Sequence, residues 1–182
     1  MSTPDLSLLL TRTAAGDREA LRAIYESMRQ PVYLYVLVQC GGNRPLAEDV
    51  LQDTFIGIWE SAPRYQPTGS AKAWILSIAR HQALKAQRRE TALVHPEEPF
   101  WEGVPSPAES TPEAITVGQS ELLRLLCTLP DRERSIVAGH VLSGFRHREI
   151  AAGLQIPLGT ELCLYRRALS RLRTLAEHTI DG

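Results

Sequence analysis

Apolar residues recur through most of the chain at the three- and four-residue spacings of amphipathic helices, and the alternation typical of strands is never sustained. Prolines, glycines and capping residues mark the ends of these segments. In the first half, Asp17 and Ser70 are expected to cap helices, and Pro31, Gly41-Gly42 and Pro63 to stop them. Four helices are therefore predicted, over residues 17–30, 32–40, 46–60 and 71–89.

A break in composition separates this half from the next. Residues 91–112 contain five prolines and no Lys or Arg, a composition typical of an extended linker. Helical periodicity resumes after Thr111-Pro112, a cap followed by a proline. Helices are predicted over 120–129, over 132–142 with Asp131 as cap, over 147–154 and over 158–178. We therefore expect an all-α protein with two small helical domains, residues 1–90 and 113–182, joined by a flexible acidic linker at 91–112.

Composition excludes several classes of protein. Hydrophobic residues make up 43% of the chain, enough for a packed core, but no apolar run approaches the roughly 20 residues of a membrane span. The N-terminus lacks the basic start of a secretion signal. Three widely spaced cysteines favour a reducing compartment, so a cytoplasmic location is expected. No metal-ligand spacing, phosphate loop or nucleophile motif is present, so we expect no metal, no cofactor and no enzymatic activity.

The net charge of −1 conceals three blocks of charge. Residues 1–90 and 121–182 each carry a surplus of +2, and the block between them carries −5. A protein that grips DNA on its own is usually far more basic. Any DNA binding is therefore expected to be weak, or to need a partner.

Two of the predicted helices carry distinctive polar faces. The helix over 46–60 places an isoleucine among carboxylates on the side away from its apolar face, which fits either a solvated surface or a partner-binding patch. The helix over 71–89 gathers basic residues near aromatic ones. That combination suits single-stranded nucleic acid, or a solvated helix end with Trp74 buried beneath it.

The segments "AEDVLQDTFIGIWESAPRYQP" and "AKAWILSIARHQALKAQRR" together resemble the promoter-melting domain of the bacterial sigma-70 family, in its extracytoplasmic-function group. The segment "LPDRERSIVAGHVLSGFRHREIAAGLQIPLGT" resembles the group's second domain, which ends in a helix-turn-helix. The resemblance covers about residues 6–90 and 114–175. It implies a dissociable transcription initiation factor that binds core RNA polymerase and promoter DNA, opens the −10 strands, and is held inactive by an anti-sigma factor.

The resemblance also implies residue roles. The set expected to bind core polymerase is Glu48, Asp49, Gln52, Asp53 and Ile56. The set expected at the −10 element is Arg64, Tyr65, Lys72, Trp74, Arg80, His81, Lys85 and Arg88. The set expected at the −35 element, on a helix-turn-helix at about 146–165, is Arg148, Thr160, Leu162, Arg166, Arg167 and Arg171. Phe100-Trp101 is expected either to anchor the linker in the polymerase or to latch onto one domain.

The chain departs from the family pattern at the helix-turn-helix. Arg146 replaces a Ser/Thr cap, and Gln155 replaces a glycine at a turn where a positive φ is expected. Glu161 replaces a core valine, and Leu162-Cys163-Leu164 replaces Lys-Ser-Arg.

Two orientations of the last helix follow. The usual rotation buries Glu161 and exposes two leucines. A rotation by about one residue exposes Glu161 and turns inward Leu162, Tyr165, Leu169 and Leu172. The domain is thus expected to read the −35 element weakly or unusually, or to serve a protein partner, the alternative being a sigma-like decoy or adaptor. His81, where the family commonly has Asn, leaves the −10 preference open as well.

Overall fold

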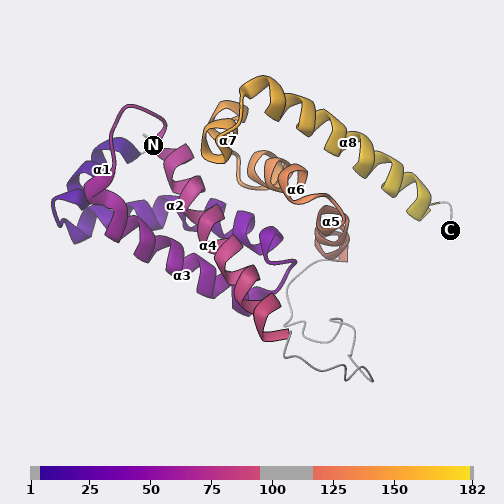
Figure 1. The fold of residues 1–182 in the computed structure, drawn as a ribbon, viewed down its shortest axis with the longest axis horizontal. Coiled ribbons are helices and arrows are strands. Elements are labelled where there is room, and N and C mark those ends of the chain that lie inside the picture. The colour runs from indigo at the N-terminus through magenta and orange to yellow at the C-terminus, as the bar shows by residue number, and fades with distance from the viewer. Residues whose placement is uncertain (1–4, 95–116, 181–182) are drawn as a thin grey trace.

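The computed structural model describes residues 5–94 and 117–180, and within these ranges every regular element is helical. The N-terminal group contains α1 (Leu6–Ala14), α2 (Arg18–Gln39), α3 (Arg44–Ser61), a 3-10 turn η1 (Ala62–Arg64) and α4 (Ala71–Val94). The C-terminal group contains α5 (Val117–Cys127), α6 (Asp131–Val137), a π-helical turn η2 (Ala138–Leu142), α7 (His147–Leu154) and α8 (Leu158–Ile180). Figure 1 shows the two groups side by side, with α8 running along the outside. The predicted all-α class is confirmed. No helix in the described ranges has the length and apolar character to span a membrane.

Helix ends follow the predicted caps in the N-terminal group. The Asp17 carboxylate accepts hydrogen bonds from the amides of Glu19 and Ala20. The Ser70 hydroxyl accepts one from the Ala73 amide at 3.3 Å. α1 was not predicted, although Asp5 caps it in the same way, because its apolar stretch is short.

The break predicted at Pro31 is wrong, since α2 is continuous from Arg18 to Gln39. An internal proline removes one helix hydrogen bond and costs about 3 kcal/mol. On either side of it, Met28, Val32 and Tyr35 are all buried. Each such side chain gains about 1.5–3 kcal/mol on burial, so tertiary packing outweighs the local penalty.

The start of α6 also differs from the expectation. Asp131 is the first helical residue, not the cap, and its carboxylate pairs with Arg134 one turn later. The cap position falls on Pro130, which provides no side-chain hydrogen bond. The helical segment ends near Ser143-Gly144 as predicted, and Gly144 takes a φ of +69°.

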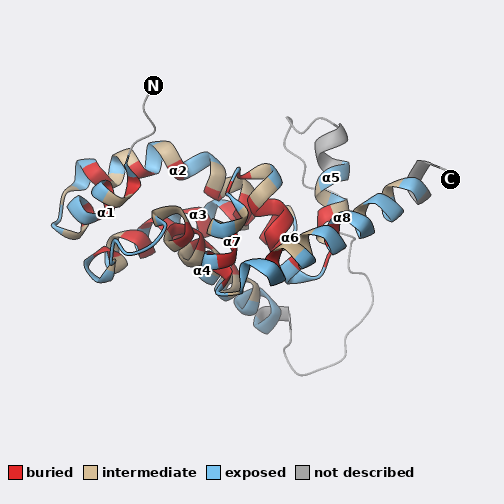
Figure 2. Ribbon diagram, turned by 90° about the horizontal axis from the view of Figure 1, so that it is seen from above, coloured by how far each residue is buried: buried red, intermediate tan, exposed pale blue. Residues whose placement is uncertain are grey.

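Buried residues of both groups form one continuous core (Figure 2). α7 packs on α4, and α6 and η2 pack on α2. At the α4–α7 contact Gly153 lies so close that a Cβ there would meet the Ala73 carbonyl at 3.0 Å. α4 reaches Val94, past the predicted start of the linker. The predictions for residues 95–112, for Phe100-Trp101 and for a helix start after Thr111-Pro112 fall outside the described residues.

The turn between α7 and α8 carries the conformation expected for it. Gln155, where the family pattern has glycine, lies in the left-handed region at φ 56° and ψ 44°. We expect Gln155→Gly to raise the free energy of unfolding by about 0.5–1 kcal/mol, because glycine occupies this region without strain. The urea midpoint should rise with an unchanged m-value. Ala152→Gly, at an exposed helical position of α7, is the matched control and should lower stability by about 1 kcal/mol. A loss in both variants would contradict the strain argument.

Candidate functional site

One face of α3 turns carboxylates and an isoleucine outward. Ala47, Val50, Leu51, Phe55 and Ile58 fill the buried side of the helix. On the other side the exposed or half-buried residues are Glu48, Asp49, Gln52, Asp53 and Ile56, here called the α3 surface. Ile56 keeps 55% of its surface exposed. Within the described residues no ion pair involves these carboxylates. The α3 surface is therefore outside the core and available to a partner.

A groove of about 400 Å³ borders the α3 surface. It lies between α2 and α3 and includes Glu48 and Gln52 beside Tyr25 and Tyr33. Tyr25 also makes an edge contact with Phe55, with ring centroids 4.8 Å apart. Glu48 thus borders a groove lined by two tyrosines and by Arg29, which the sequence pattern alone did not indicate.

The start of α4 pairs two aromatic rings. Tyr65, at the end of η1, meets Trp74 edge-on with ring centroids 5.1 Å apart. The Tyr65 hydroxyl is 3.1 Å from the hydroxyl of Ser7 in α1. Both rings are half-buried, so Trp74 is neither a fully buried core residue nor a free one. Each ring is held from one side and leaves part of its surface to solvent.

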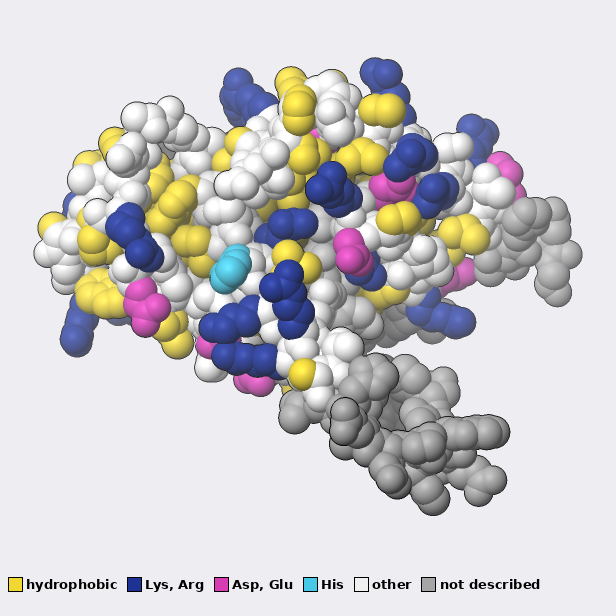
Figure 3. Space-filling model, in the orientation of Figure 1, with side chains coloured by type: hydrophobic (Ala, Val, Ile, Leu, Met, Phe, Trp, Pro, Cys, Tyr) yellow, Lys and Arg dark blue, Asp and Glu magenta, His cyan; other side chains and the backbone are white. Residues whose placement is uncertain are grey.

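Further along α4, basic residues line one exposed side. His81, Lys85, Arg88 and Arg89 border a shallow groove of about 340 Å³ with Leu84 and Ala92. Figure 3 shows Lys and Arg side chains beside a histidine over this part of the molecule. This side of the helix can attract a polyanion.

The structure does not bring all the residues predicted for the −10 element to that side of α4. Arg80 is half-buried and close to Tyr35, and its positive charge acts to lower the pKa of the Tyr35 hydroxyl. Burial dominates that pKa and raises it to about 12. Lys72 is half-buried two residues before Trp74, so the two side chains point to different sides of the helix. Arg64 is exposed at η1.

In the helix-turn-helix, α7 and α8 are joined by the turn at Gln155. The buried side of α8 is marked by Glu161 and Ala168, both 0% exposed. Of the residues predicted for the −35 element, Leu162 is half-buried, and the exposed ones are Arg148, Thr160, Arg166, Arg167 and Arg171. Figure 3 shows basic side chains along α8.

Burial of Glu161 decides between the two predicted orientations of the last helix. The usual rotation is kept, and the alternative that exposes Glu161 is wrong, because Leu169 is 41% exposed whereas the carboxylate is inside. The two leucines of the turn, Leu162 and Leu164, are half-buried, not fully exposed. The rotation is kept because a polar partner is available for the carboxylate.

That partner belongs to a cluster of rings. His147 Nδ1 lies 2.9 Å from Glu161 Oε1. Its ring stacks on His140 at 4.0 Å between centroids, and Tyr165 meets both histidines edge-on. His140 donates from Nδ1 to the Phe145 carbonyl. Glu161 Oε2 has no hydrogen-bond partner among the described residues. Within the described part of the chain, the Glu161 carboxylate therefore has His147 as its one hydrogen-bond partner.

Arg146 provides no side-chain cap for α7, as its chemistry predicts. The N-terminal turn is secured differently, because the Glu149 carboxylate accepts a hydrogen bond from the Arg146 amide at 2.8 Å. This is one half of a capping box.

A second buried carboxylate lies beneath α8 and was not singled out from the sequence. Glu133 of α6 is 1% exposed. Its Oε1 accepts a hydrogen bond from Arg167 Nε at 2.7 Å, and its Oε2 lies 3.6 Å from Arg171 Nη1. A sequence pattern cannot reveal this contact, since Glu133 and Arg167 are 34 residues apart.

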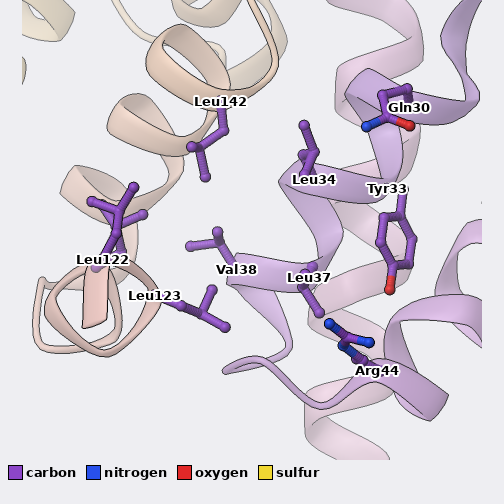
Figure 4. A pocket seen from close by; sticks show the side chains of 10 residues that line it. Gln30, Tyr33, Leu34, Leu37, Val38, Arg44, Leu122, Leu123 and Leu142 are labelled. Carbon is purple, nitrogen blue, oxygen red and sulfur yellow. The ribbon is translucent and has the colours of Figure 1, made fainter. Parts of the chain in front are cut away.

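An apolar groove of about 360 Å³ lies between α2 and α5 (Figure 4). Leu34, Leu37 and Val38 of α2 line one side, and Leu122 and Leu123 of α5 line the other. Leu122 is 39% exposed. The groove depends on the way the two groups pack, which the sequence did not predict. Over the described residues, no group of three or more His, Cys, Asp or Glu side chains has a metal-binding arrangement.

Comparison with known proteins gives matches along most of the chain. Residues 24–92 match the family model described as Sigma-70 region 2. The chain is 30% identical to the ECF RNA polymerase sigma factor RpoE of Cereibacter sphaeroides, over 75% of this chain and 76% of that protein. It is also 30% identical to the ECF RNA polymerase sigma factor SigD of Mycobacterium tuberculosis, over 92% of this chain and 82% of that protein.

Two solved structures share the fold. CnrH in complex with the cytosolic domain of CnrY superposes with a TM-score of 0.70 at 19% identity, covering 94% of this chain and 97% of that one. The sigma factor RpoE in complex with the anti-sigma factor NepR from Bartonella quintana gives a TM-score of 0.63 at 21% identity, covering 95% of this chain and 94% of that one.

Proposed function

The chain belongs to the extracytoplasmic-function group of the sigma-70 family, and from this premise we propose a role for each surface described above. It is a transcription initiation factor that binds RNA polymerase. In our proposal residues 1–90 bind the polymerase and the −10 element, residues 91–112 form an acidic linker, and residues 113–182 bind the −35 element. The observation that carries the proposal is the α3 surface, where Ile56 is exposed among carboxylates that have no ion pair within the described residues.

Polymerase binding is assigned to the α3 surface. An exposed apolar side chain ringed by charges has the make-up of an interface hot spot, in which a desolvated centre is surrounded by polar contacts. The surrounding carboxylates favour a basic partner surface and speed its encounter with the protein.

Contact with the −10 element is assigned to the Tyr65–Trp74 pair and to the basic side of α4. The half-buried rings offer a stacking surface to an unpaired base, and His81, Lys85 and Arg88 offer charge to the strand that carries it. Holding an extruded base repays part of the energy of unstacking it. Arg80 is half-buried near Tyr35 of α2 and is therefore the weaker member of this set.

Contact with the −35 element is assigned to the exposed side of α8. Arg166 and Thr160 lie there in the open, so they meet DNA first when α8 enters a major groove. The half-buried Leu162 and Leu164 stand where the family has Lys and Arg and provide no phosphate or base hydrogen bond. We expect the −35 contribution to specificity to be smaller than in relatives that keep those residues.

Regulation is assigned to an anti-sigma protein bound between the two helix groups. The apolar groove between α2 and α5 offers such a protein a binding surface with residues from both groups. Because its net charge is −1, we expect the chain to bind promoters only as part of the holoenzyme. We also propose that it acts in the cytoplasm and that it is a regulator without catalysis of its own.

The test is co-purification with core RNA polymerase, followed by run-off transcription from the region upstream of the protein's own gene. A specific transcript that depends on the added protein is the expected result. A decoy or adaptor would bind core polymerase without directing a transcript, and failure to bind would overturn the proposal.

The orientation of α8 on DNA gives a second test. Cys163 is an exposed thiol on the side of α8 assigned to DNA, so promoter binding by the holoenzyme is expected to slow its alkylation several-fold. Cys40 is the internal reference, because burial raises its pKa to about 11 and keeps it slow to react with or without DNA. Iodoacetamide labelling followed by peptide mass spectrometry measures both. Equal rates for Cys163 on promoters with an intact and a replaced −35 region would contradict the docking.

A further inference from the structure

The contact between α6 and α8 links a buried charge to two arginines assigned to DNA (Figure 1). Glu133 is 1% exposed, yet Arg167 and Arg171 keep 58% and 48% of their side-chain surface exposed. The carboxylate is thus buried, while about half of each arginine side chain is exposed. A buried carboxylate is costly unless it is paired, which explains why the pair forms but not why both arginines remain so open.

Of the two exposed α8 arginines that contact Glu133, Arg167 lies within hydrogen-bond distance at 2.7 Å, whereas Arg171 is 3.6 Å away. The Arg167 Nε donates to Glu133 at 2.7 Å, which sets the direction of the fork, and the described residues provide no hydrogen bond to its Nη groups. Among the residues that the structure describes, Arg173 pairs with Glu177, which is itself 64% exposed. For Arg166 the described part of the chain provides no ion pair.

The position of Arg167 on the helix suggests which part of DNA it meets. Cys163, Arg166 and Ser170 lie almost opposite the buried Glu161 and Ala168, whereas Arg167 lies on the flank next to α6. A helix in a major groove presents its outermost residues to base edges and its flanks to the phosphates beside the groove. Phosphate oxygens are also the acceptors that a pre-oriented arginine fork fits best.

We propose that Glu133 is a positioning residue for promoter binding: it orients Arg167 so that its Nη groups meet backbone phosphates beside the −35 element. This inference rests on the assignment of α8 to the −35 element. Glu133 itself touches no DNA. Its effect is to remove rotamer freedom from an arginine before binding, so that less is lost when the complex forms.

Charge repulsion alone predicts the opposite effect of a Glu133 substitution on DNA binding, which makes the inference testable. A carboxylate near DNA repels phosphates, so its removal should strengthen binding if Glu133 has no positioning role. We expect Glu133→Met, which fills the same space without charge, to weaken the binding of the reconstituted holoenzyme to promoter DNA roughly threefold to tenfold. The probe is a fluorescent duplex taken from a promoter that the holoenzyme transcribes, with its −35 region intact or replaced.

Three further variants separate positioning from folding. Arg167→Ala should weaken binding and lower the salt slope by about 1, the signature of one lost phosphate contact. Glu133→Met should add little in the Arg167→Ala background, but should keep its full effect in the Arg166→Ala background, the matched control. Glu133→Asp keeps the charge but is too short to hold Arg167, so it should also weaken binding. It serves where Glu133→Met prevents holoenzyme assembly.

The outcomes discriminate between the two claims. Unchanged or tighter binding by the Glu133 variants, while the wild-type holoenzyme prefers the intact −35 region, overturns the positioning role alone. A wild-type holoenzyme with no such preference overturns the assignment of α8 as well. Equal losses for Glu133→Met in the Arg166→Ala and Arg167→Ala backgrounds would show that its effect does not pass through Arg167.

Discussion

Replacing His147 by alanine is expected to destabilise the protein by about 3 kcal/mol, because it leaves the Glu161 carboxylate buried without a partner. That carboxylate is 0% exposed, and Oε2 already lacks a hydrogen bond within the described residues. His147 Nδ1 at 2.9 Å satisfies the other oxygen. Urea denaturation of the wild type and the variant measures the difference.

The reverse substitution should behave in the opposite way. Glu161→Val removes the buried charge and restores the residue of the family pattern, so stability should stay the same or rise by about 1 kcal/mol. In that background His147→Ala should cost less than about 1 kcal/mol, since no carboxylate is left to pair. His81→Ala is the control at an exposed histidine and should change stability by no more than about 0.5 kcal/mol. A large loss from His147→Ala in the Glu161→Val background would contradict the pairing and assign the loss to ring packing.

The sequence predicts structure most reliably where a local signal acts over a few residues. Asp17 and Ser70 cap helices because a side-chain oxygen reaches amides two or three residues ahead. Gln155 is left-handed because the α7–α8 turn requires it, whichever residue is present. The helix break predicted at Pro31 is wrong for the opposite reason. The local penalty of the proline is outweighed by the burial of its neighbours against helices far away in the sequence.

A helical pattern cannot predict contacts between residues that are distant in the sequence. The sequence placed Glu161 on the last helix but could not say that His147, 14 residues earlier, would receive its carboxylate. It placed Arg167 among the DNA contacts but not Glu133 beneath it. Periodicity grouped Arg80 with His81, whereas Arg80 is half-buried and lies close to Tyr35 of α2. The α3 surface was identified correctly as exposed because it lies on one helix and needs only the direction of the core.

Reversing the charge at Asp49 and Asp53 together is expected to weaken the binding of core RNA polymerase roughly hundredfold, since each lysine replaces an attraction with a repulsion at the proposed interface. Folding should be unaffected, because Asp49 is exposed, Asp53 is half-buried, and neither has an ion pair within the described residues. Titration of labelled core polymerase gives the dissociation constants.

We do not expect the change in net charge alone to cause this loss of polymerase binding, and two matched variants test this. Glu121→Lys with Glu177→Lys changes the net charge by the same amount at exposed positions in the C-terminal group, and should leave polymerase binding within about threefold. Ile56→Ala leaves the charge unchanged and should still weaken binding by about thirtyfold, because it removes the apolar centre of the surface. Tight binding by both Ile56→Ala and the Asp49/Asp53 variant would place the polymerase contact elsewhere on the protein. A loss in the Glu121/Glu177 variant equal to that of the Asp49/Asp53 variant would reduce the α3 surface to a general effect of charge.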